Sequence, residues 1–132
     1  DRVGRKWPTI VGFLICSGGV FAFPALSTPV EWSIAAAVTG VGMALLYPNL
    51  SASVADITPP AWRGSAIGIY RFWRDLGYAI GALGLGLAAQ WAGDLTGGVV
   101  FVALSMAASG LWLYVFGAET HPRLAPLPDA LR

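Results

Sequence analysis

Three charged residues, Arg71, Arg74 and Asp75, stand at the start of a long apolar stretch that ends before Gly93. A helix needs about 20 residues to cross the hydrocarbon of a bilayer, so counting back from Gly93 places these charges at or just inside its edge. A charged side chain at the centre of a bilayer costs on the order of 2.5 to 3.5 kcal/mol, so such residues are usually paired and usually functional.

The spacing of these charges suggests how they act. Arg71 and Asp75 are four residues apart and share a helix face. With Arg74 they are predicted to form a charge network that opens and closes during a conformational change. The alternative is that both arginines reach lipid phosphates and that Asp75 only neutralises one of them.

Polar side chains also gather in the preceding apolar run, within residues 30–54. An amide and several hydroxyls in hydrocarbon need hydrogen-bonding partners, so this part of the helix is expected to face protein or a water-filled cavity. Pro48 lacks an amide hydrogen and is expected to kink the helix. Hydrogen bonding between helices alone is the alternative interpretation. The candidate cavity-lining residues are Thr39, Tyr47, Asn49, Ser51, Ser53 and, from the next run, Tyr78.

Glycines form a further pattern in the third run. Gly77 and Gly81 are four residues apart, and Gly64 and Gly68 repeat the spacing. Small residues at this spacing let another helix approach closely, so these four glycines are predicted to be packing positions. A glycine-rich face also suits a helix that slides or rocks against a partner.

The remaining reactive side chains do not form a catalytic pattern. His121 stands alone near the end of the chain, and Cys16 is the single cysteine. The sequence shows no carboxylate pair, metal-ligand spacing or phosphate-binding loop, so we expect no enzymatic activity, no cofactor and no metal site. The net charge of +1 is not gathered on a basic face, so nucleic acid is not an expected partner.

The elements that must hold these residues are apolar helices. Hydrophobic residues make up 56% of the sequence and charged residues 11%, a composition too apolar for an ordinary soluble domain. Short connections make successive helices antiparallel neighbours. The first and fourth runs carry scattered Cys, Ser and Thr, which are expected to bond to their own backbone and to lie against lipid. The predicted fold is one all-α integral membrane domain over 1–132, with four antiparallel transmembrane helices at about 8–26, 30–54, 67–92 and 99–117 and an irregular tail at 118–132.

Lysine and arginine define the expected topology. They precede the first run, separate the second from the third and follow the fourth, whereas the connections at 27–31 and 93–96 contain none. Short loops rich in Lys and Arg stay on the cytoplasmic side, so both ends of the chain are predicted to be cytoplasmic. The eight basic residues are Arg2, Arg5, Lys6, Arg63, Arg71, Arg74, Arg123 and Arg132.

These features resemble the major facilitator superfamily of secondary transporters. The hexapeptide Asp1-Arg2-Val3-Gly4-Arg5-Lys6 is similar to the end of a loop signature found between the family's second and third helices and again between its eighth and ninth. Residues 47–81 resemble the tenth and eleventh helices of bacterial members, and residues 119–122 resemble their closing segment. The chain starts inside the loop signature, so we expect a fragment. Helices nine to twelve are the favoured placement, and helices three to six are the alternative.

The resemblance implies a function and partners. It implies secondary active transport of a small solute by alternating access. Transport would be coupled to an ion, and efflux by antiport is one form of such transport. The implied location is the bacterial inner (plasma) membrane. It also implies a twelve-helix fold in which the first and fourth runs are peripheral, the second lines the cavity and the third lies between two halves. The expected partners are a small-molecule substrate, membrane lipid and the missing N-terminal half. A free-standing four-helix membrane protein, such as a small multidrug carrier or an assembly subunit, is the alternative.

The resemblance further implies a cytoplasmic latch that favours the outward-open state. In the family, the loop signature and charged residues at the start of a helix in the opposite half form this latch. Gly4 would permit the tight turn that aims the flanking charges. For Arg5 and Lys6 the alternative role is topology alone. The latch residues are Asp1, Arg2, Gly4, Arg5 and Lys6 in the loop, and Arg71, Arg74 and Asp75 as partners for the absent half.

Overall fold

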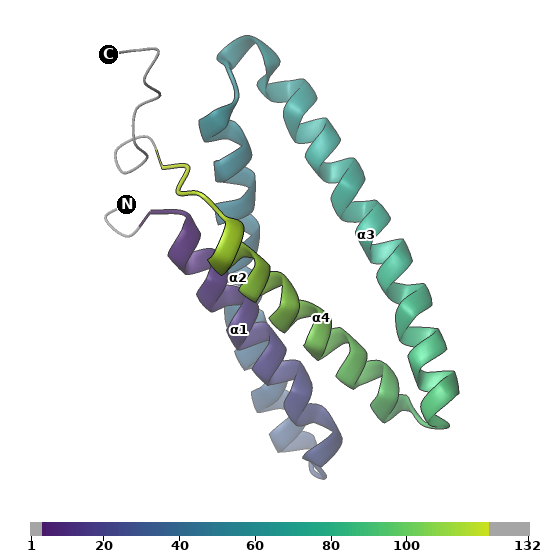
Figure 1. The fold of residues 1–132 in the computed structure, drawn as a ribbon. Coiled ribbons are helices and arrows are strands. Elements are labelled where there is room, and N and C mark those ends of the chain that lie inside the picture. The colour runs from purple at the N-terminus through teal and green to yellow at the C-terminus, as the bar shows by residue number, and fades with distance from the viewer. Residues whose placement is uncertain (1–3, 122–132) are drawn as a thin grey trace.

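The computed structural model describes residues 4–121, and these residues form helices joined by short connections (Figure 1). The predictions for Asp1 and Arg2 and for the tail from residue 122 onward lie outside the described residues. The elements are α1 (Lys6–Ala22), the 3-10 turn η1 (Phe23–Ala25), α2 (Pro29–Ile57), the 3-10 turn η2 (Pro60–Trp62), α3 (Arg63–Ala92) and α4 (Leu95–Phe116).

Three helices of the described chain are long and apolar enough to cross a membrane: α1 with η1 (Lys6–Ala25), α2 and α4. α3 is the longest helix, at 30 residues, but charged residues and glycines in its first half dilute its apolar character. Thirty residues span about 45 Å, which exceeds the hydrocarbon thickness of about 30 Å. The apolar part of α3 after Asp75 therefore has room to span while its start lies beyond the hydrocarbon.

Two helices begin earlier than the apolar pattern indicated. α3 begins at Arg63 rather than at residue 67, and α4 begins at Leu95 rather than at residue 99. α3 follows directly on the 3-10 turn η2, and the start of α4 is set by the turn between α3 and α4. Gly93 adopts a φ of +78°, which ends α3, and the Asp94 side chain accepts a hydrogen bond of 3.2 Å from the amide of Gly97, which starts α4.

α2 starts with a reciprocal cap. The Thr28 hydroxyl accepts from the amide of Glu31 at 3.3 Å, and the Glu31 carboxylate accepts from the amides of Thr28 and Ser27 at 3.0 and 2.9 Å. Pro29 occupies the first turn, where its missing amide hydrogen costs nothing. Farther along, Pro48 lies inside a helix that continues to Ile57, so α2 is one helix across this proline, and the kink stays a prediction.

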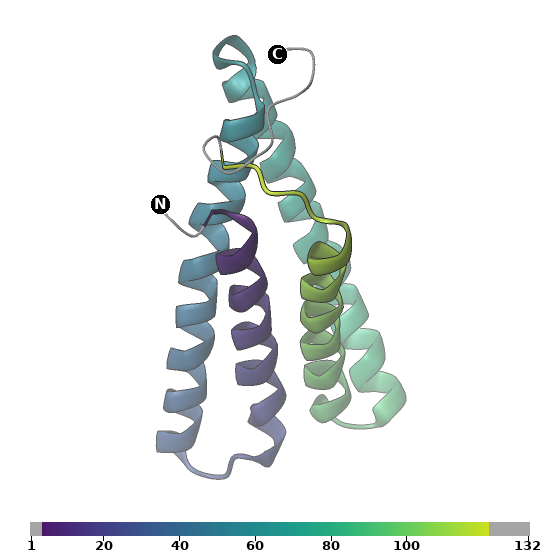
Figure 2. The same cartoon turned by 60° about the vertical axis from the view of Figure 1, so that its left-hand side comes forward.

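α1 lies between α2 and α4, while α3 packs against α4 and meets α2 only slightly (Figure 2). Glycines allow the close approach of α1 and α2. A Cβ atom at Gly12 would lie 2.9 Å from the carbonyl oxygen of Gly42, and a Cβ atom at Gly42 would lie 2.9 Å from the carbonyl oxygen of Gly12. The backbones of the two helices therefore touch at this point.

The prediction that the polar side chains of the first run bond to their own backbone and face lipid is wrong for two of them. The Cys16 thiol is fully buried and donates to the carbonyl oxygen of Thr39 in α2 at 3.4 Å. The Ser17 hydroxyl donates to the carbonyl oxygen of Ala103 in α4 at 2.8 Å. Both bonds cross to neighbouring helices, because α1 forms the middle of this bundle.

In α4 the predicted bonding of polar side chains to their own backbone is confirmed. The hydroxyl of Ser105 donates to the carbonyl oxygen of Phe101, and that of Ser109 donates to the carbonyl oxygen of Ser105, each at 2.8 Å. Both serines are exposed in this bundle.

Candidate functional site

A carboxylate joins the end of α4 to the start of α1. The Glu119 side chain accepts hydrogen bonds from the amides of Arg5 at 2.8 Å and Lys6 at 3.2 Å, and from the amide of His121 at 2.8 Å. The first amides of a helix have no partner within it and lie at the positive end of its dipole, so they suit an anion. Glu119 therefore caps the N-terminus of α1, although it lies 114 residues from Arg5 in the sequence.

Gly4 makes this cap possible. Its φ is +76°, in the region that side chains with a Cβ rarely adopt, and the residue is buried. A Cβ atom built at this position would collide with the Glu119 carboxylate. The sequence predicted a tight turn at Gly4, but it did not predict that the turn makes room for Glu119.

The side chain of Arg5 adds an ion pair to α2. Its Nε atom donates to Oδ2 of Asp56 at 3.1 Å, and the two side chains are 23% and 18% exposed. Partial burial reduces the screening that weakens ion pairs on an open surface. We refer to Gly4, Arg5, Lys6, Asp56 and Glu119 as the clasp.

The clasp gives two residues of the loop signature partners within the described chain. Gly4 and Arg5, which the resemblance assigns to a latch with the opposite half, contact Glu119 and Asp56 of their own half. The latch with the opposite half stays a prediction. Asp56 and Glu119 were noted only as parts of the family resemblance. Nothing in their local sequence indicates the contacts, because 51 and 114 residues separate them from Arg5.

The acidity of Glu119 reflects these contacts. Burial alone would raise the pKa of its carboxyl group, but hydrogen bonds from the amides of Arg5, His121 and Lys6 outweigh burial and lower the pKa below its ordinary value. A lowered pKa in the folded protein stabilises the fold above the pKa of the unfolded chain. This stabilisation is lost as the pH falls through the folded-state pKa.

We therefore expect Glu119→Gln to lower the thermal unfolding midpoint of the full-length protein at neutral pH. The variant keeps the shape of the side chain but loses charge-assisted bonds, each worth about 1.5 to 3 kcal/mol. The difference from the wild type should shrink as the pH falls below the ordinary range of a glutamate, when the wild-type carboxylate also takes up a proton. A difference that is constant with pH would contradict the role of its charge.

The charges of α3 pair differently from the expectation. Asp75 Oδ1 lies 2.8 Å from an Nη atom of Arg74 and 2.9 Å from its Nε atom. The predicted pair of Arg71 with Asp75, four residues apart, is thus replaced by a pair of sequence neighbours, because a long arginine side chain can fold along the helix surface. The Asp75 side chain is 62% exposed, so the pair contributes little to stability here.

Three of the candidate cavity residues of α2 are satisfied by their own helix. The hydroxyl of Thr39 donates to the carbonyl oxygen of Ala35, the amide group of Asn49 to that of Leu45, and the hydroxyl of Ser53 to that of Asn49, at 2.9, 2.6 and 2.8 Å. Helical periodicity places Thr39, Asn49 and Ser53 on the side of Gly42 and Leu46, which meets α1. Each of these side chains thus finds one acceptor within α2, and a role in lining a cavity stays a prediction.

The other candidates lie on a different side. Tyr47 and Ser51 share the α2 face opposite to Asn49. The hydroxyl of Tyr47 is hydrogen-bonded to the hydroxyl of Tyr78 in α3. This bond links two helices that otherwise contact each other little.

The four glycines predicted to be packing positions have open space beside them in the described chain. A Cβ atom at Gly64, Gly68, Gly77 or Gly81 would meet nothing within 4 Å. Other glycines allow the close helix contacts, and the two in α1 are seven residues apart, a spacing that the sequence already contains. They are Gly12, Gly19 and Gly42 between α1 and α2, and Gly84, Gly97 and Gly98 between α3 and α4.

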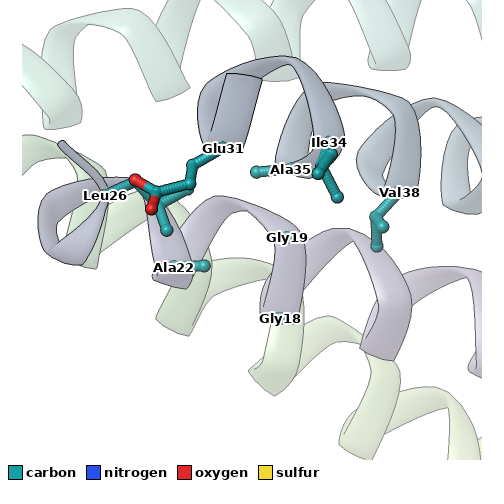
Figure 3. A pocket seen from close by; sticks show the side chains of 8 residues that line it. All are labelled: Gly18, Gly19, Ala22, Leu26, Glu31, Ile34, Ala35 and Val38. Atoms are coloured by element: carbon teal, nitrogen blue, oxygen red, sulfur yellow. The ribbon is translucent and has the colours of Figure 1, made fainter. Parts of the chain in front are cut away.

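An apolar groove of about 290 Å³ lies between α1 and α2, near their connection (Figure 3). The carboxylate of Glu31 lies at one end, beside Ala22 and Leu26, but it is already engaged in the cap of α2. The groove lacks the convergent polar groups that orient a solute. Its lining residues are Gly18, Gly19, Ala22, Leu26, Glu31, Ile34, Ala35 and Val38.

Comparison with known proteins agrees with this architecture. An uncharacterised MFS-type transporter of Salmonella typhimurium is 32% identical over 78 residues, which cover 59% of this chain and 20% of that protein. Uncharacterised MFS-type transporters of Burkholderia mallei and Burkholderia pseudomallei are 33% identical over 84 residues, or 57% of this chain and 21% of theirs. The chain thus spans about a fifth of the length of these relatives, and no solved structure matches it significantly. The family model of the Major Facilitator Superfamily matches residues 1–131, so the chain belongs to the major facilitator superfamily.

Proposed function

We propose that this chain is helices nine to twelve of a secondary transporter, not an enzyme, and that the whole protein moves a small solute by alternating access. The observation that carries this proposal is the exposure of α3. None of its 30 residues is buried, although the helix contains charges, aromatic side chains and a row of glycines. A helix of this kind needs partners beyond α4. Solute sites in such transporters lie near the middle of the membrane between two repeats.

The clasp supports the division of the transporter into moving units. It fastens the start of α1 to the ends of α2 and α4, so these three helices are tied together at one end. In this proposal they move as one body, and α3 makes the sliding contact with the missing N-terminal half. Arg71, Arg74 and Asp75 then form the part of the latch that this half presents.

We further propose that transport is coupled to an ion. In an exporter this coupling takes the form of antiport. Asp75 is the one carboxylate of the described helices that lies far from a helix end. An ionisable residue at this depth is a natural participant in a charge network that changes between inward-open and outward-open states.

We expect Asp75→Asn to leave the abundance of the full-length transporter in the membrane unchanged and to slow exchange in proteoliposomes at least tenfold. The substitution preserves shape and removes the charge that pairs with Arg74. Wild-type exchange by Asp75→Asn would contradict a role for this residue in alternation.

The proposed location is the inner (plasma) membrane, with both ends of the chain in the cytoplasm, as the distribution of Lys and Arg favours. Single cysteines at Thr28 and Thr96, which are exposed and lie at connections without basic residues, should react with an impermeant thiol reagent added to intact cells. A cysteine at Ala61, which is equally exposed, should react only after the cells are opened. The background must lack Cys16. Labelling of Ala61 in intact cells would reverse the topology.

A further inference from the structure

Aromatic hydroxyls and one guanidinium group converge where α3 faces α2. Tyr70, Arg74 and Tyr78 follow one another at intervals of four residues and therefore lie on one face of α3. Tyr47 reaches across from α2 to hydrogen-bond with Tyr78. Tyr70 and Tyr78 flank Arg74 on this face, and Tyr47 joins them through Tyr78, so the four side chains form one cluster.

The burial pattern sets this face apart from the rest of the helix. Tyr47, Tyr70 and Arg74 are half-buried and Tyr78 is 54% exposed, whereas Phe72 and Trp73 are more than 60% exposed. Three of the four side chains in the cluster are thus partly sheltered, although most of α3 has no cover in the described chain. A guanidinium group in such a place acts more strongly on a ligand than one in open water.

Open space adjoins the cluster. Gly77 and Gly81 share the face of Arg74 and Tyr78, and a Cβ atom at either glycine would meet nothing within 4 Å. Glycine in a helix costs about 1 kcal/mol relative to alanine. Because glycine has no side chain, Gly77 and Gly81, one helical turn apart, leave a strip of exposed helix backbone against which the apolar part of a ligand can lie.

The donors that remain in the cluster suit an anion. Asp75 occupies the Nε atom and one Nη atom of Arg74, which leaves further N–H groups of the guanidinium for another acceptor. The phenol groups of Tyr47 and Tyr78 can also donate. A carboxylate has two oxygens that accept such bonds, and charge-assisted bonds of this type are about twice as strong as neutral ones. The tyrosine rings provide flat apolar surfaces for an aromatic body.

We propose that Tyr47, Tyr70, Arg74 and Tyr78, with the open strip at Gly77 and Gly81, bind the carboxylate and ring of an aromatic organic anion. This proposal rests on the proposed transport function, because it names the class of solute. Arg74 holds the carboxylate, the hydroxyls of Tyr47 and Tyr78 orient it, and the ring lies along the glycine strip. The hydrogen bond between the hydroxyl groups of Tyr47 and Tyr78 breaks when the ligand binds.

The test uses the full-length transporter in nanodiscs of phosphatidylcholine, with benzoate as the probe and benzamide as its uncharged counterpart. Wild-type protein should bind benzoate at least tenfold more tightly than benzamide, as measured by calorimetry or by the shift of the unfolding midpoint. Arg74→Gln should abolish this preference, and Arg74→Lys should retain part of it. Tyr47→Phe and Tyr78→Phe should each weaken benzoate binding threefold or more.

A matched control separates the site from general electrostatic attraction. Arg63 lies in the first turn of α3 and donates to the carbonyl oxygens of Ala55 and Thr58, so Arg63→Gln removes the same charge outside the cluster. It should leave benzoate binding within twofold of the wild type. Equal losses in Arg63→Gln and Arg74→Gln, or equal binding of benzoate and benzamide by the wild type, would overturn the proposal.

Two further outcomes are informative. Stabilisation by phosphatidylglycerol in the nanodisc, lost in Arg74→Gln and without a response to benzoate, would assign the cluster to a lipid headgroup and overturn the proposal. Spin labels on the two halves report alternation independently of the ligand. If the protein populates inward-open and outward-open states but does not distinguish the two probes, the solute class is wrong while the transport function stands. If it does not alternate either, both fail.

Discussion

Gly4→Ala is expected to lower the unfolding midpoint of the full-length transporter by several degrees and to impair its transport. A Cβ atom at a φ of +76° costs about 1 to 2 kcal/mol in backbone strain. It would also displace the Glu119 carboxylate from the amides of Arg5 and Lys6, and loss of such bonds costs about 1 to 3 kcal/mol. Differential scanning fluorimetry and exchange in proteoliposomes measure the two effects.

The matched control is Gly18→Ala. Gly18 is an exposed residue inside α1, and a Cβ atom there would meet nothing within 4 Å. Alanine is favoured over glycine inside a helix by about 1 kcal/mol, so this variant should be as stable as the wild type or more so. The double variant Gly4→Ala/Glu119→Ala should be less destabilised than the sum of its single changes, because the two residues collide directly. Strict additivity would mean that the clasp does not depend on their contact.

The sequence was sufficient to predict the helical architecture but not the helix ends. Four apolar runs joined by short connections predicted four antiparallel helices, because run length and loop length leave few alternatives. Apolar character marks only the part of a helix that suits hydrocarbon. A helix begins and ends at caps, turns and glycines, as Gly93 and Asp94 show between α3 and α4. The first residues of α4 were therefore missed, and so were those of α3, which begins directly after η2.

The contacts of the candidate site could not be predicted from the sequence, for a different reason. Gly4 and Arg5 could be selected from the loop pattern, but their partners Glu119 and Asp56 are brought to them by the packing of α1 against α2 and α4. Tertiary contacts of this kind leave no local trace. Burial of the Cys16 thiol against Thr39 is a further example, since a lone cysteine in an apolar run looks the same in a central helix and in a peripheral one.

Helical phase divides one group of candidate residues that the sequence prediction kept together. The polar residues of α2 were grouped because they are close along the chain, without regard to helical phase. At 100° per residue, Tyr47 and Ser51 fall on one face, while Asn49 and Ser53 fall on the opposite one. The structure places the second pair toward α1 and bonds it to the helix backbone. Phase thus distinguishes the polar residues on the α1 side of α2 from those on its opposite face.

Gly42→Val is expected to destabilise the contact of α1 with α2 strongly. Even the first side-chain atom at this position would meet the thiol of Cys16 and lie 2.9 Å from both its amide nitrogen and the carbonyl oxygen of Gly12. Backbone atoms cannot turn aside as a flexible side chain can, so the helices must move apart. Overpacking of this kind costs about 1 to 3 kcal/mol. The unfolding midpoint of the full-length protein should fall accordingly.

Gly40→Val is the control for this change, because it places the same β-branched residue two positions away in α2, where a Cβ atom meets nothing within 4 Å. Both variants carry the same helix-propensity change, so their difference isolates the contact with α1. Cys16 provides a second measurement. Its side chain is fully buried between the two helices, and separation of the helices should speed its reaction with a maleimide in Gly42→Val but not in Gly40→Val. Equal midpoints and equal labelling rates in the two variants would show that α1 and α2 do not meet through Gly42 in the assembled transporter. A selective effect of Gly42→Val would instead establish that α1 keeps its central position when the missing half is present.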